Sequence, residues 1–189
     1  SQNIELSVND IEGLAKFAQE KNCFTVVGPE DPLAAGIVDT FIEKGLPVFG
    51  PTQNAAQLES SKIWAKEFMK RNSIPTADFQ IFDDAQSAKD FVKSYEKPVV
   101  IKADGLAAGK GVIVCQNKDE ANDAIDTILT KKSFGDAGSK IIIEERIDGI
   151  EASYIALCDG KIGIPEATSQ DGKRICDNDE DPNTGGMGA

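Results

Sequence analysis

Two lysines and three glycines lie close together between two apolar runs of β-branched residues. Lys102 ends the first run, and the loop that follows contains Gly105, Gly109, Lys110 and Gly111. Glycine allows the backbone to approach a ligand closely, and its amide N–H groups suit anionic oxygens. Because positive charge lies at both the root and the tip of the loop, this hairpin predicts a polyphosphate-binding site. An ordinary glycine-containing hairpin is the alternative interpretation.

The spacing of these residues differs from that of a P-loop. A P-loop has four residues between its first glycine and Gly-Lys, with Ser or Thr after the lysine. Here three residues separate Gly105 from Gly109, and Gly111 follows the lysine. A P-loop also leads into a helix, whereas the residues from Val112 to Cys115 are mostly β-branched and predict a strand.

The composition of the chain excludes several functions. The 189 residues carry a net charge of −12, which argues against a nucleic-acid partner because backbone binding needs a basic surface. Histidine is absent, so no Ser/His or Cys/His catalytic arrangement can form, and acid–base work would fall to carboxylates, lysines or the substrate. The hydrophobic share of 40% is typical of a soluble globular protein, and no run is long enough to cross a membrane.

The chain contains four cysteines, Cys23, Cys115, Cys158 and Cys176. They are widely spaced, and three of them lie in apolar or strand-like runs. This pattern favours buried thiols in a reducing cytoplasm over a disulfide framework, and the lack of a Cys-x-x-Cys pair argues against zinc.

The elements that position the hairpin begin with a βαβ unit in residues 1–52. A helix capped by Asn9 precedes a strand at 24–28, and a helix at 33–44 leads to a strand at 48–49. Two such strands form a parallel pair. We expect this unit to be the last part of a larger Rossmann-like domain, because it is short and the chain does not begin with methionine.

The loop after the first of these strands is a candidate substrate site. Ligands in open parallel sheets bind beyond the carboxyl ends of the strands. Gly28, Pro29 and Glu30 occupy that position. A simple turn would also explain these residue types, and the sequence leaves both interpretations open.

Residues 53–73 predict a linker helix, from about Asn54 to Arg71, that carries Lys62. A lysine on an exposed helix face is usually only solvated. An α+β module follows over residues 74–144. Around the glycine hairpin we expect, in order, a strand at 78–82, a helix at 84–95, a helix at 118–131 and a strand at 140–145.

The end of this last strand is a candidate hinge. It carries Glu144 and Glu145, and Arg146, Ile147 and Glu151 follow. A segment between two sheets is a common nucleotide site, where backbone groups read the base and a carboxylate binds the ribose hydroxyls. A charged strand end that faces water is the alternative.

The remainder of the chain contains one more hairpin and a polar tail. Asp159-Gly160 joins two strand-like runs and predicts the hairpin. Asp171 and Lys173 precede an acidic run that Pro182 interrupts, so the run does not fit a calcium loop. The final glycines predict close approach to a small substrate, although a disordered tail would explain them equally well. The candidates are Asn183, Thr184, Gly185, Gly186, Met187 and Gly188.

Together these motifs resemble those of the phosphoribosylamine–glycine ligases, which are ATP-grasp enzymes. The resemblance rests on segments that occur in the family's order, at 25–30, 47–52, 58–62, 102–111, 144–145 and 182–188. It implies a mixed α/β and α+β fold, in which residues 74–144 form the small (lid) subdomain of an ATP-grasp fold and residues 145–189 begin its large subdomain. It also implies that ATP phosphorylates glycine, and that 5-phosphoribosylamine attacks the resulting acyl phosphate in the second step of purine synthesis.

The resemblance also implies roles for individual residues. Lys62 and Lys102 correspond to phosphate-contacting lysines, and residues 105–111 correspond to a mobile loop over ATP. Glu145, Arg146 and Ile147 correspond to a hinge that reads adenine, and Glu151 corresponds to the carboxylate that binds ribose. The substrate side corresponds to Gly28, Pro29, Glu30, Asp171, Lys173 and residues 183–188.

The chain departs from the family pattern in some places. Gly172 stands where the family usually has histidine, and Glu180-Asp181 stands where it has Thr-Gly. The family's N-terminal glycine-rich segment and its downstream metal-binding segment are missing. We therefore expect the ligands of Mg²⁺ (or Mn²⁺) to lie outside this chain, and we expect the chain alone to be an inactive fragment.

Two other functions remain open, and the oligomeric state is not predicted. A different ATP-grasp ligase, such as a purine-pathway carboxylase relative, would share the nucleotide features of this chain. A nucleotide-binding module without catalysis would also keep them. The downstream sequence of the gene would discriminate between these possibilities, because a ligase needs an acidic metal-binding segment there.

Overall fold

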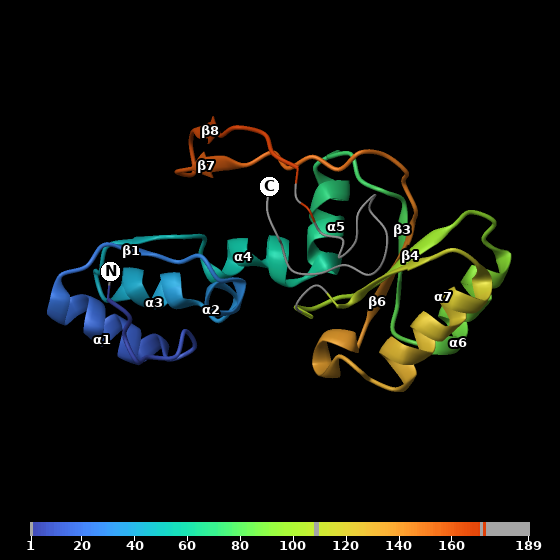
Figure 1. The fold of residues 1–189 in the computed structure, drawn as a ribbon, viewed down its shortest axis with the longest axis horizontal. Coiled ribbons are helices and arrows are strands. Elements are labelled where there is room, and N and C mark those ends of the chain that lie inside the picture. The colour runs from blue at the N-terminus through green and yellow to red at the C-terminus, as the bar shows by residue number, and fades with distance from the viewer. Residues whose placement is uncertain (1, 108–109, 171, 173–189) are drawn as a thin grey trace.

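The computed structural model describes residues 2–107, 110–170 and 172. Figure 1 shows a small N-terminal unit at one end of the molecule and a four-stranded sheet with two helices at the other. Helices α4 and α5 connect the two, and a separate two-stranded hairpin follows the large sheet.

The N-terminal unit is a parallel βαβ arrangement, as predicted. Its elements are α1 (Ile11–Lys21), β1 (Thr25–Val26), α2 (Glu30–Ala34), α3 (Ile37–Glu43) and β2 (Val48–Phe49). Thr25 pairs with Val48 in parallel register. A small core of α1 and α3 side chains, which includes Ala15 and Phe41, holds the unit together.

Two local predictions for this unit are wrong. The cap of α1 is Asp10 rather than Asn9, because the Asp10 side chain accepts a hydrogen bond from the Gly13 backbone N–H. The predicted helix at 33–44 is two helices, since Gly36 adopts a φ of +86° between them. Only glycine reaches this left-handed conformation without strain, so the helix breaks there.

The predicted linker helix is also two helices, α4 (Gln53–Ser60) and α5 (Lys62–Arg71). Ser61 lies between them in an extended conformation, with φ −134° and ψ 111°. Its side chain accepts a hydrogen bond from the Trp64 N–H and so caps α5. Lys62 is therefore the first residue of a helix and not a residue on a helix face.

The four-stranded sheet is antiparallel, with the strand order β3-β6-β4-β5. The predicted strands, helices and glycine hairpin are confirmed. The elements are β3 (Phe79–Phe82), α6 (Ala85–Ser94), β4 (Val99–Ala103), β5 (Val112–Cys115), α7 (Lys118–Ile125) and β6 (Ile141–Glu145). Helix α7 continues as one π-helical segment, Asp126–Thr130, and a 3₁₀ helix at Gly135–Gly138 precedes β6.

The two faces of this sheet differ because side chains alternate along each strand. One face packs against α6 and α7, and its core includes Ile101, Ile141 and Ile143, each no more than 1% exposed. The neighbouring residues of the same strands, Lys102 and Glu144, lie on the opposite face. The apolar core thus holds these two charged side chains at fixed places on a rigid sheet.

Beyond the sheet, β7 (Ala156–Cys158) and β8 (Gly163–Pro165) form the predicted hairpin. Asp159 stabilises its turn by accepting hydrogen bonds from the N–H groups of Lys161 and Ile162. The expectation of buried thiols holds for Cys115 and is wrong for Cys158, which is exposed. Among the described residues, no helix combines the length and the apolar character that a membrane span requires.

Candidate functional site

The centre of the candidate site is an ion pair between two strands of the large sheet. Lys102 on β4 lies opposite Ile142 on β6, and Glu144 lies opposite Val100, so the two charged residues are diagonal neighbours on one face. The Lys102 Nζ lies 3.0 Å from the Glu144 Oε2. The Lys102 side chain is 26% exposed, so its ammonium remains accessible to a ligand on this face.

A second lysine, Lys66 on α5, contacts the same carboxylate oxygen at 3.2 Å. It also donates hydrogen bonds to the Thr76 Oγ1, at 2.7 Å, and to the Ala77 carbonyl, at 3.2 Å. Lys66 is only 7% exposed, and this burial lowers the pKa of its ammonium while the Glu144 charge opposes the shift.

Lys66 is not among the site residues predicted from the sequence. A signal for it existed in the spacing of α5. Lys66 lies three residues from both Ile63 and Met69, so it interrupts the apolar stripe of an amphipathic helix. A lysine in such a place has to find a buried partner, and here that partner is Glu144.

Glu144 is the most buried acid of the site, at 5% exposed. Its Oε2 contacts both lysines, whereas its Oε1 has no hydrogen-bond partner among the described residues. A buried carboxylate needs compensating charge. The two lysines supply it, and they gather positive charge locally in a chain whose net charge is −12.

The root of the glycine hairpin is attached to the start of α5. The Asp104 carboxylate accepts hydrogen bonds from the Ser61 hydroxyl, at 3.0 Å, and from the Ile63 N–H, at 2.8 Å. The Lys62 N–H donates to the Asp104 carbonyl, and the Lys62 Nζ donates to the Gly105 carbonyl at 3.1 Å. Burial lowers the pKa of Lys62, and the Asp104 charge opposes that shift. Lys62 thus lies at the root of the hairpin, and its contact with phosphate stays a prediction.

The glycines at the two ends of the hairpin loop are required by packing. A Cβ on Gly105 would lie 2.8 Å from the Ala137 Cβ, and one on Gly111 would lie 2.8 Å from the Ala107 Cβ. Neither residue has the positive φ that would need glycine on conformational grounds. The Ala103 N–H donates to the Gly111 carbonyl and closes the hairpin. Gly109 lies outside the described residues.

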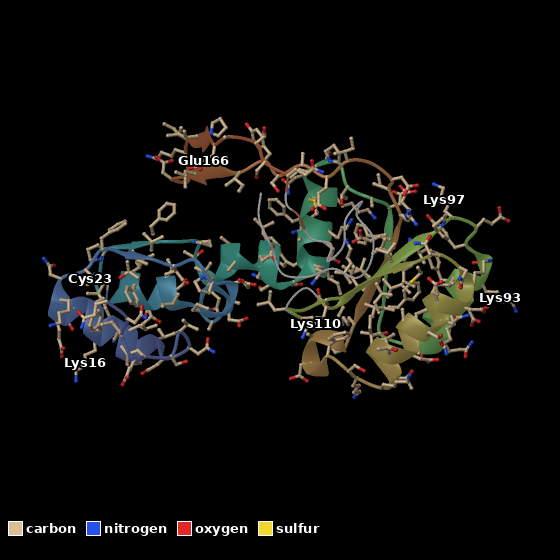
Figure 2. The ribbon with its side chains drawn as sticks, viewed as in Figure 1. Lys16, Cys23, Lys93, Lys97, Lys110 and Glu166 are labelled. Atoms are coloured by element: carbon tan, nitrogen blue, oxygen red, sulfur yellow. The ribbon has the colours of Figure 1, made fainter. Side chains whose placement is uncertain are left out.

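Lys110 is exposed at the tip of the glycine hairpin. Figure 2 shows it at the opposite end of β4 from Lys97. Lys110 is thus accessible to solvent, and its approach to a bound phosphate stays a prediction.

Backbone groups of the candidate hinge are partly occupied. The Glu145 N–H donates to the Asp78 carbonyl, and the Arg146 N–H donates to the Pro98 carbonyl. The Ile147 N–H makes no hydrogen bond within the described part of the chain, and the Ile147 side chain is 68% exposed. Of the three hinge residues, Ile147 therefore has the N–H that is available to a ligand.

Side chains brace the same hinge. The Lys97 Nζ lies 2.7 Å from the Glu145 Oε2. The Arg146 guanidinium donates to Asp148 and to the Gln116 side chain. Glu151, the candidate ribose ligand, is exposed just beyond this braced segment.

A cavity of about 570 Å³ lies beside β3, between the 73–80 segment and the start of the hinge. Glu144 and Glu145 line it, whereas Lys62, Lys102 and Lys110 do not. Of the charged residues on the lysine-bearing face, Glu144 is therefore the one that also lines this cavity. The candidate site is therefore placed where Lys66, Lys102 and Glu144 meet, and not in this cavity.

The predicted substrate residues lie elsewhere or outside the described part. Gly28, Pro29 and Glu30 connect β1 to α2 in the N-terminal unit, and a Cβ on Gly28 would meet nothing within 4 Å. The structure does not join them to the lysine network by any recorded contact among described residues. The other candidates fall outside that part: Asp171, Lys173, Asn183, Thr184, Gly185, Gly186, Met187 and Gly188.

A metal site needs several oxygen, nitrogen or sulfur ligands that converge on one point. The described residues contain no group of three His, Cys, Asp or Glu side chains that could hold a metal ion. The acidic residues nearest the lysines are already paired with them, as Glu144 and Glu145 show. The described residues therefore supply no ligand set for Mg²⁺ or Mn²⁺, and polyphosphate binding by the lysines stays a prediction.

An antiparallel sheet with helices on one face, lysines on the other and a hinge leading to a further hairpin defines an ATP-grasp protein. Solved structures support this class. N5-carboxyaminoimidazole synthetase from Staphylococcus aureus matches 91% of this chain and 43% of its own, with a TM-score of 0.67 at 15% identity. At that identity the likeness shows the fold alone.

The chain belongs to the phosphoribosylglycinamide synthetase family. Residues 1–59 match the family's N domain, and residues 60–189 match its ATP-grasp (A) domain. The phosphoribosylamine–glycine ligases of Vibrio vulnificus and Ralstonia nicotianae are 54% and 57% identical over 189 residues, which are 100% of this chain and 44% of theirs. The ligase structure from Thermotoga maritima covers 86% of this chain and 39% of its own, with 33% identity and a TM-score of 0.72.

These comparisons confirm the resemblance and the fold class predicted from the motifs. They also show that the chain spans less than half the length of the curated relatives it matches.

Proposed function

We propose that this chain forms the nucleotide-binding part of an ATP-dependent ligase that joins glycine to 5-phosphoribosylamine. The products would be glycinamide ribonucleotide, ADP and phosphate. The observation that carries the proposal is the pair of accessible lysines, Lys62 and Lys102, beside a glycine hairpin in a member of this family. The names of the relatives from two organisms agree with this activity.

The chemistry explains why such a site needs positive charge. The glycine carboxylate is a poor acyl donor, because an oxide ion would have to leave. Attack of a carboxylate oxygen on the γ-phosphorus of ATP forms a glycyl phosphate and releases ADP. The amine of 5-phosphoribosylamine then attacks the acyl carbon, and phosphate leaves as the amide bond forms. Catalysis of both steps depends on positioning and on neutralising phosphate charge.

The described residues suit the nucleotide in this scheme. Lys102 and Lys62 would contact the phosphates, and Lys110 would approach them when the loop of residues 105–111 closes. The Ile147 N–H would donate to the base, because it has no hydrogen-bond partner in the described part of the chain, whereas the N–H groups of Glu145 and Arg146 do. Glu151 would accept hydrogen bonds from the ribose hydroxyls.

The acceptor side of the reaction is proposed from the family correspondence. Asp171, Lys173 and residues 183–188 would contact glycine and 5-phosphoribosylamine, and residues 28–30 would complete that surface. Magnesium or manganese would bind to ligands outside the described residues and neutralise further phosphate charge. The free thiols of Cys23, Cys115 and Cys158 support a location in the reducing cytoplasm.

The direct test measures ADP release by the full-length ligase with and without each substrate. We expect release to require both glycine and 5-phosphoribosylamine, and Lys102→Met to lower kcat/KM for ATP by about 100-fold. Lys93→Met is the matched control, because Lys93 is exposed on α6 and away from the site. ADP release that is independent of both substrates, or equal turnover by Lys102→Met and the parent, would refute the proposal.

A further inference from the structure

Two ammonium groups share one carboxylate oxygen at the centre of the site, and they are held very differently. Lys66 and Lys102 lie 3.2 and 3.0 Å from the Glu144 Oε2. Lys66 has two further acceptors, Thr76 and Ala77, and its side chain is 8% exposed. Lys102 has no other hydrogen-bond partner among the described residues, and its side chain is 26% exposed. Lys66 is therefore fixed, whereas Lys102 is free to turn toward a ligand.

The burial of Glu144 makes this difference important. Its side chain is 6% exposed, so its charge cannot be left to water when a lysine moves away. If Lys102 were its sole counter-ion, each contact between Lys102 and a phosphate would compete with the need to neutralise a buried carboxylate. Because Lys66 stays in place, Glu144 remains paired while Lys102 engages another anion.

The other charged residues around Glu144 support the same distinction between a fixed Lys66 and a free Lys102. Burial contributes most to the lowered pKa of Lys66, the charge and hydrogen bond of Glu144 oppose it, and Lys102 and Asp78 have smaller effects. Burial also contributes most to the lowered pKa of Lys62. The charges of Asp104, Glu59 and Glu144 oppose this shift, and the charge of Lys102 adds to it. The site thus places three lysines around one buried acid, and Lys66 is the one that the surrounding chain shields from solvent.

We propose that Lys66 is a positioning residue that serves as the permanent counter-ion of Glu144 and so releases Lys102 to bind the nucleotide phosphates. The proposal rests on the proposed function, because it takes Lys102 to be a phosphate ligand. It adds a role for a helix residue that does not itself touch the nucleotide. It also gives Glu144 a role, because this residue of β6 positions the ammonium groups of both lysines.

The test is carried out on the full-length ligase, with ATP as the probe. Lys66→Met keeps the length of the side chain and removes the charge, so Lys102 becomes the sole ammonium on Glu144. We expect the KM for ATP and the dissociation constant for ADP to rise about tenfold, with a smaller change in kcat. Lys70→Met, one turn further along α5 and exposed, is the matched control and should leave both constants unchanged.

A double variant separates positioning from general damage to the fold. Lys66→Met with Glu144→Gln removes the buried charge that retains Lys102, so nucleotide affinity should return to within about threefold of the parent. Lys66→Arg, which keeps the charge, should also bind nucleotide better than Lys66→Met. An unchanged ATP KM in Lys66→Met, or a double variant no better than the single one, would overturn the proposal.

Lys102→Met separates this proposal from the proposed function. Weak nucleotide binding by Lys102→Met together with normal binding by Lys66→Met would overturn only the role of Lys66. Normal nucleotide binding by Lys102→Met would show instead that Lys102 is not a phosphate ligand, and both proposals would then fail.

Discussion

The Asp104 carboxylate accepts a hydrogen bond of 2.8 Å from the backbone N–H of Ile63, in the first turn of α5. The two residues are far apart in sequence, and this contact joins the root of the glycine hairpin to the helix that carries Lys66. A carboxylate at a helix N-terminus satisfies a backbone N–H that the helix leaves unpaired, and it interacts favourably with the helix dipole. The Asp104 side chain thus attaches the root of the glycine hairpin to the N-terminus of α5.

Replacement of Asp104 by alanine should therefore affect both stability and nucleotide use. The variant loses the bonds from the Ile63 N–H and the Ser61 hydroxyl, which leaves two donors without their partner. We expect a loss of about 1–3 kcal/mol in the free energy of unfolding, measured by urea titration. The KM for ATP should rise, because the hairpin root is then held less firmly against α5 and Lys62 loses its fixed position beside the Gly105 carbonyl.

Asp104→Asn is the control for this prediction, since its amide oxygen can still accept from both donors. It should lose less than half of the stability that the alanine variant loses. If the two variants were equally stable, the hydrogen bonds of Asp104 would have no role in attaching the hairpin to α5.

Gly105→Ala should destabilise the chain by overpacking. The new Cβ would lie 2.8 Å from the Ala137 Cβ and 2.9 Å from its Cα, so the backbone of one segment has to move. Such overpacking costs about 1–3 kcal/mol, measurable as a lower midpoint of urea unfolding. Combining it with Ala137→Gly should restore part of the loss, because one of the two clashing Cβ atoms is then gone.

Gly149→Ala is the matched control for the packing argument. A Cβ at Gly149 would meet no atom within 4 Å, and its φ is not positive. This variant should be as stable as the parent or slightly more stable. Equal stability of Gly105→Ala and Gly149→Ala would mean that the loop moves freely away from Ala137.

Much of the large sheet could be predicted from the sequence, because its strands are continuous apolar runs and its turns contain glycine. The apolar run at Val99–Ile101 and the glycines after it identify the hairpin without reference to the rest of the fold. The break at Ser61 was not predictable in the same way. Ser61 caps α5 locally by accepting from the Trp64 N–H, but it also donates to Asp104, a residue of another element, and no local pattern contains that second contact.

The candidate site likewise contains one residue that a local pattern predicts and two whose contact depends on tertiary packing. Lys102 was predictable because it stands between a strand and a glycine loop, a local arrangement. Lys66 and Glu144 form their contact only when α5 packs on the open face of the sheet. A pairwise contact between distant elements leaves no mark on the spacing of either one, apart from a charged residue in an apolar stripe.

Cys115 should be unreactive toward thiol reagents in the native protein. Burial raises the pKa of its thiol to about 11, so roughly one molecule in a thousand carries the reactive thiolate at pH 8. Iodoacetamide labelling followed by mass spectrometry should modify the exposed Cys158 and leave Cys115 unmodified until urea is added. Equal labelling of both under native conditions would show that β5 opens readily.

The pair of Lys97 and Glu145 should make the hinge sensitive to acid. The hydrogen bond and charge of Lys97 lower the pKa of Glu145 below its ordinary value. A depressed carboxyl pKa stabilises the fold above the unfolded pKa of about 4.3, and that contribution disappears as the pH falls through the lower native pKa.

Lys97→Met should therefore raise the pKa of Glu145, observed by carboxyl ¹³C NMR titration. Because the Glu145 N–H stays bonded to Asp78, the hinge backbone should keep its place at neutral pH. An unchanged titration of Glu145 in that variant would mean that the pair does not persist in solution.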